Sequence, residues 1–202
     1  LGVPVHRIGS LKAAVQLIEM YAKIDAMDDT SLEKEFWRMG LTSTRKRREE
    51  QLRCLKGYAL WNILPSAELS KEWDERRRQL EGRGIPCTTS SMQIHQNELQ
   101  HRHFLLENLQ SALSVEEWEA RRIPVKKCES LSGAAKLAAQ WDRLEAMSFE
   151  HLKDEAGDIG VPFVAVDREE LRSRLKTVMA WSLMSSHSLQ EECRSHAVAF
   201  SG

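Results

Sequence analysis

The sequence predicts an all-α protein made of tandem helical repeats. Apolar residues recur at the three- and four-residue spacing of helices through most of the chain, and no segment shows the strict alternation of a half-buried strand. The chain also aligns with itself at a fixed period, which is typical of repeat architectures. A composition of 42% hydrophobic and 29% charged residues fits a folded chain rather than a disordered one.

The longest repeat has a period of 120 residues. Shifted by that distance, the sequence aligns with itself over 82 pairs without a gap, and about 20 of those pairs are identical, where average residue usage predicts roughly 5. Apolar identities mark the residues expected to form equivalent cores in the two copies. They are Leu17 with Leu137, Leu55 with Leu175, and Trp61 with Trp181.

A shorter period of about 40 residues lies within the long one. Its marker is a small residue followed by an aliphatic one, and at Gly40 and Gly160 we expect it to end a helix because glycine adopts the left-handed conformation at little cost. The marker recurs at Gly2, Gly40, Gly84 and Gly160, with degenerate copies at Arg122-Ile123 and Ala197-Val198. It divides the chain into the repeats 1–40 (a partial start), 41–83, 84–121, 122–159 and 160–202, the last with the start of a further unit.

Each unit is predicted to form a helix, a tight turn and a second helix. Before Gly40, residues 31–39 place Leu32, Phe36 and Met39 on one helical face. The helices after the turns carry the stripes Leu52, Leu55, Ala59, Trp61 and Leu171, Leu175, Val178, Met179. Further helices are predicted over about 11–27, 94–113 and 131–147. A unit of this length cannot bury its apolar face alone, so we expect the units to stack in an elongated array.

Polar residues at the predicted helix starts indicate capping boxes, in which two side chains satisfy the free backbone N–H groups of the first turn. Three pairs have the required spacing. They are Thr30 with Glu33, Ser114 with Glu117, and Asp167 with Glu170.

Residues 155–162 (EAGDIGVP), followed by Arg168-Glu169-Glu170-Leu171 and Arg174-Leu175, resemble the SAP motif, a helix–turn–helix unit. Tandem, diverged SAP-like units of this kind are similar to those abundant in dinoflagellate proteins. The resemblance is close over 148–181 and implies DNA binding through the second helix and a Gly-x-Lys turn before it. The turn here, 163–167 (FVAVD), has neither the glycine nor the lysine.

The distribution of charge is the main test of nucleic-acid binding. The chain holds 29 basic and 30 acidic residues, but residues 38–83 alone carry 12 basic and 7 acidic ones. The basic candidates for a partner surface are Arg45, Lys46, Arg47, Arg48, Arg76, Arg77 and Arg78. They form either a phosphate-binding patch or a solvated helix face that pairs with neighbouring glutamates or a protein partner.

Aromatic residues, histidines and cysteines point to structural roles. Trp37 lies beside its helix's apolar stripe, so we expect it to be exposed and to anchor a protein partner, as tryptophan often does at interfaces. His101 and His103 point about 200° apart on a helix and make no metal pair, and His95 is too distant from His103. The four dispersed cysteines are expected to be free thiols in a reducing compartment.

These observations favour a non-catalytic scaffold without metal or cofactor. Common nucleotide-binding, hydrolase and metalloprotease motifs do not occur in the sequence, and no apolar run reaches the roughly 20 residues of a membrane helix. We therefore expect an interaction subunit of a larger protein assembly. The dinoflagellate resemblance implies a plastid location and a peripheral subunit of a photosystem-type complex. The alternative is a SAP-type nucleic-acid-binding protein that uses residues 38–83.

Overall fold

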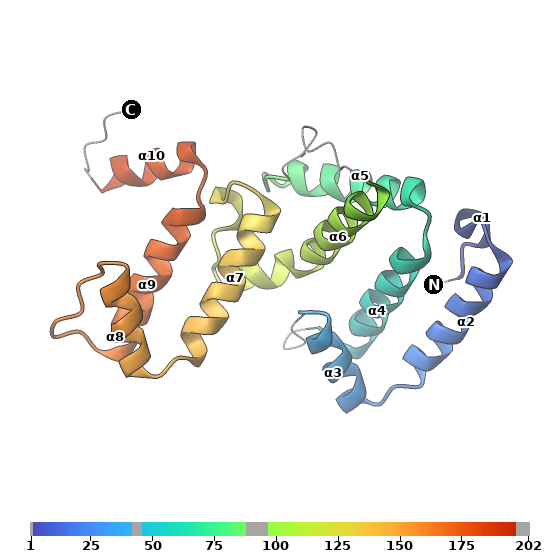
Figure 1. The fold of residues 1–202 in the computed structure, drawn as a ribbon, viewed down its shortest axis with the longest axis horizontal. Coiled ribbons are helices and arrows are strands. Elements are labelled where there is room, and N and C mark those ends of the chain that lie inside the picture. The colour runs from blue at the N-terminus through green and yellow to red at the C-terminus, as the bar shows by residue number, and fades with distance from the viewer. Residues whose placement is uncertain (1, 42–45, 88–96, 197–202) are drawn as a thin grey trace. The chain divides into compact units, whose positions relative to one another are not determined.

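The computed structural model describes residues 2–41, 46–87 and 97–196, and these residues are all-helical (Figure 1). They form ten α-helices and one short 3-10 helix, η1, and their one pairing of β type is an isolated bridge between Cys128 and Met184. The all-α prediction is confirmed. The α-helices are α1 (Val5–Ile8), α2 (Leu11–Asp25), α3 (Asp29–Arg38), α4 (Arg48–Ile63), α5 (Ser66–Gly82), α6 (Glu98–Ala120), α7 (Leu131–Ala146), α8 (Phe149–Asp158), α9 (Arg168–Leu183) and α10 (Ser186–Ser195), and η1 covers Val125–Lys127.

The described residues divide into two compact units. Unit 1 comprises 2–82 and 97–117, and unit 2 comprises 83–87 and 118–196. The helix bounds of the two units correspond after a shift of 120 positions. Helices α3 and α8 coincide at both ends, as do α4 and α9, while α2 and α5 begin where α7 and α10 begin.

The same polar contacts recur in both units at positions 120 residues apart. Lys56 Nζ lies 2.7 Å from the carboxylate of Asp25 and 5.4 Å from the centre of the Tyr21 ring. In unit 2, Lys176 Nζ lies 2.7 Å from Glu145 and 4.8 Å from the centre of the Trp141 ring. Lys56 ties α4 to α2 and Lys176 ties α9 to α7, so the same two contacts fix the same helix pair in both units.

Two further contacts recur with the same spacing. The guanidinium of Arg48, in the first turn of α4, donates to the carbonyl of Met27, and that of Arg168 donates to the carbonyl of Met147 over 2.7 Å. Near the start of each unit, Arg7 pairs with Glu72 and Lys127 pairs with Glu192. These contacts connect elements that are far apart in the sequence.

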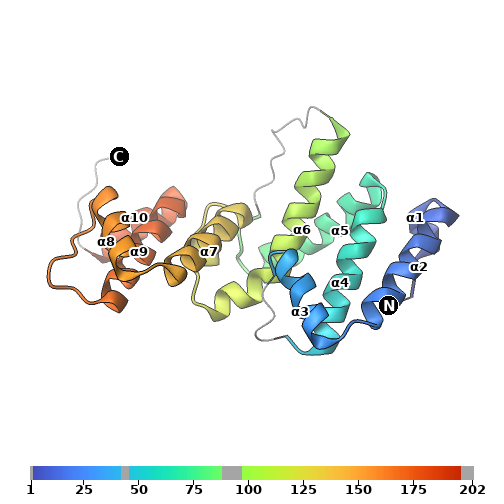
Figure 2. The ribbon, with the colours of Figure 1, turned by 60° about the horizontal axis from the view of Figure 1, so that its bottom comes forward.

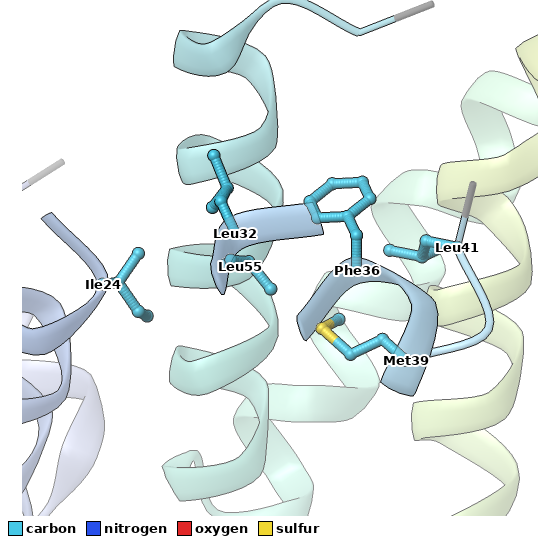
Figure 3. Packing of buried hydrophobic residues seen from close by; sticks show 6 residues of the cluster. All are labelled: Ile24, Leu32, Phe36, Met39, Leu41 and Leu55. Carbon is cyan, nitrogen blue, oxygen red and sulfur yellow. The ribbon is translucent and has the colours of Figure 1, made fainter. Parts of the chain in front are cut away.

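The core of unit 1 lies where α3 packs against α4 (Figure 3). Phe36 is fully buried there, with Leu32 and Leu55 beside it. In the matching core of unit 2, alanine stands at position 156 in place of the phenylalanine, and Leu171 enters the cluster where unit 1 has Gln51. The extra leucine supplies volume that the smaller residue gives up, which keeps the core packed.

Left-handed residues end the helices before the turns, as predicted for Gly40 and Gly160, whose φ angles are 67° and 74°. After both glycines, the next N–H donates to a carbonyl five residues back, from Leu41 to Phe36 and from Val161 to Ala156. This bond folds the aliphatic side chain onto the last helical turn and buries it. Gly9 after α1, with φ 69°, and Gly84 after α5, with φ 76°, are left-handed as well.

The predicted capping boxes are partly wrong. The cap of α3 is Asp28, whose carboxylate accepts from the Ser31 N–H over 2.7 Å, so the helix begins one residue before Thr30. Ser114 begins no helix, because α6 runs without interruption to Ala120 and buries this serine. Asp167 caps α9 as expected and accepts from the Glu170 N–H over 2.8 Å.

The degenerate marker at Arg122 yields a stability prediction. Arg122 is exposed and has φ 64°, and the N–H of the next residue, Ile123, bonds to the Trp118 carbonyl as in the glycine turns. A side chain in this conformation costs about 1 kcal/mol, so Arg122→Gly is expected to raise the free energy of unfolding by up to about that amount. Urea denaturation measures the change. Gly160→Ala, the opposite substitution in the same type of turn, should lower stability, and equal stability of all three proteins would contradict the argument.

Candidate functional site

The first predicted basic cluster is largely engaged in tertiary contacts. Arg45 lies outside the described residues. Lys46 Nζ donates to the Leu113 carbonyl of α6 over 3.4 Å, and Arg48 pairs with Asp29 and the Met27 carbonyl. Arg47 is exposed at the start of α4, where its backbone N–H donates to Glu50. Two of these cations therefore hold unit 1 together, which reduces the charge available to a ligand.

The second basic cluster lies on α5. The side chains of Arg77 and Arg78 both bond to Asp74, one to its carboxylate and one to its carbonyl. Arg76 is half-buried and lies close enough to Cys54 to act on its charge, as does Lys46 from the first cluster. Burial raises the pKa of the Cys54 thiol, and these two cations oppose that shift.

Trp37 on α3 is 60% exposed, as expected from its place beside the apolar stripe, whereas the adjacent Phe36 is fully buried. Its role as a partner anchor stays a prediction. Of the tryptophans in the long period, Trp61 is buried and Trp181 is half-buried. The leucines Leu17, Leu55, Leu137 and Leu175 are all buried, as expected for repeat-defining core positions.

The histidines and cysteines have structural surroundings. His101 Nε2 lies 3.3 Å from the Ser70 hydroxyl, His103 pairs with Glu107 on its own helix, and His95 lies outside the described residues. Among the described residues, no group of three or more His, Cys, Asp or Glu side chains has the arrangement of a metal site. All four cysteines are free thiols.

The surface feature that sequence reasoning missed is a second apolar stripe on α2. Leu11, Val15, Ile18 and Ala22 follow one another at intervals of four, three and four residues and are all exposed, Leu11 by 76%. Another face of the helix, with Leu17 and its neighbours, packs against α4. We define these four residues as the α2 stripe. The signal was present in the sequence, because apolar residues on two faces of one helix predict that both are covered.

Two of the positions equivalent to the α2 stripe are buried in unit 2. Leu131, at the position of Leu11, is 1% exposed, and Ala138, at the position of Ile18, is also buried. Arg121, from the segment between α6 and η1, pairs with Asp142, which stands at the position of Ala22 and is exposed. The side chains of Leu11 and Ile18 are thus exposed where their counterparts on α7 are buried.

A second open apolar surface lies on unit 2, where the turn after α8 meets α9. It is a groove of about 360 Å³. Its rim includes Ile159, which is substantially exposed, and Phe163 and Val164 of the adjoining turn are exposed as well. We define the groove by its lining residues, which are Ile159, Gly160, Val161, Pro162, Ser173, Arg174, Thr177, Val178 and Trp181.

The thiol environments lead to a chemical prediction. Burial raises the pKa of Cys128 to about 11, so only about one molecule in a thousand carries the thiolate at pH 8. Cys193 on α10 is half-buried. Alkylation of the native protein with iodoacetamide, followed by mass spectrometry, should modify Cys193 well before Cys128, and both should react at similar rates in denaturant. Faster labelling of Cys128 in the native protein would contradict this assignment.

No helix in the described ranges has both the length and the apolar character needed to cross a bilayer. Comparison with protein-family models, with curated proteins and with solved structures found no match to this chain.

Proposed function

We propose that this protein is a non-catalytic helical scaffold that binds other subunits of a larger protein assembly. The observation that carries the proposal is the α2 stripe, four exposed apolar residues along one face of a helix. Contiguous apolar surface on a folded protein marks an interaction site, and the spacing of Leu11, Val15 and Ile18 is that of the anchors in helix–helix recognition.

The energetics favour coverage of the stripe. Burying one leucine, isoleucine or valine side chain stabilises a complex by about 1.5 to 3 kcal/mol. The three large residues of the stripe therefore offer several kcal/mol, before the entropic cost of association. This surface is available without any rearrangement of unit 1, because the residues of α2 that pack in the core, such as Leu17, lie on another face of the helix.

The wider identity of the assembly is proposed from the sequence resemblance. The helix–turn–helix elements α8 and α9, with the left-handed Gly160 between them, and the correspondence of helix bounds over 120 residues support tandem SAP-like units. Within that family resemblance we propose a plastid location and a peripheral place in a photosystem-type complex.

Nucleic-acid binding is the second candidate, favoured by the excess of basic over acidic residues in 38–83, which is 12 against 7. Phosphate binding requires cations that are free to release counterions across several contacts. Arg48 and Arg77 instead pair with Asp29 and Asp74. We therefore rank this candidate below the scaffold.

The scaffold proposal is tested at the α2 stripe. A photo-crosslinking amino acid at Val15 should capture a discrete protein partner in native extract of the source organism. Leu11→Glu with Ile18→Glu should abolish the crosslink, because two carboxylates in an apolar interface would lose their hydration. Gln16→Glu places the same charge on α2 away from the stripe and should leave the crosslink intact. Absence of a discrete product, or its survival in the double variant, would contradict the proposal.

A titration with nucleic acid distinguishes the scaffold proposal from the nucleic-acid alternative. We expect labelled duplex DNA and single-stranded RNA to show no saturable binding to the chain at about 50 mM salt, where phosphate contacts are strongest. Fluorescence anisotropy measures this. Tight binding with a steep salt dependence that is lost on Arg45→Ala with Arg47→Ala would instead establish the alternative.

A further inference from the structure

We draw no further inference here: the strongest candidate, the apolar groove of unit 2 where the turn after α8 meets α9 (Figure 2), is an open surface, and nothing in the described residues shows what covers it.

Discussion

The helix pair of each unit depends on burial of the aliphatic residue that follows its left-handed turn. Leu41 and Val161 fold back onto the preceding helix because their N–H groups bond to carbonyls five residues earlier. This geometry fixes the direction in which the chain leaves the turn toward the next helix. Lys56 then ties α4 to α2, and Lys176 ties α9 to α7. A helix pair built in this way leaves apolar residues on its outer faces, and a further helix must cover them.

Sequence periodicity was sufficient for the fold class and for most buried positions. Leu17, Leu55 and their counterparts could be identified because one face of a helix repeats at a fixed spacing. Local signals failed where tertiary packing decided the outcome. The pattern at Ser114 resembles a helix start, but Leu105, Leu109 and Val115 lie on buried surface along one continuous helix, which extends through the serine.

The candidate surfaces were less predictable for a related reason. The sequence identifies Trp37 as a candidate anchor and the arginines as a candidate basic surface. It does not show which acidic residues pair with the arginines, because a partner such as Asp29 for Arg48 lies on another helix. The apolar pattern of the α2 stripe is present in the sequence, but the sequence does not show that these residues are exposed. Leu11 and Leu131 are identical residues at equivalent positions, and what decides their burial is the presence of a covering segment rather than their own chemistry.

Equivalent positions of the two units differ in burial although their local geometry is the same. Gly40 and Gly160 occupy the same left-handed turn, and a glutamine from α6 contacts one of them while the other borders an open groove. The local sequence therefore sets the form of each turn, whereas the burial of the apolar residues around it depends on the helix that packs over them.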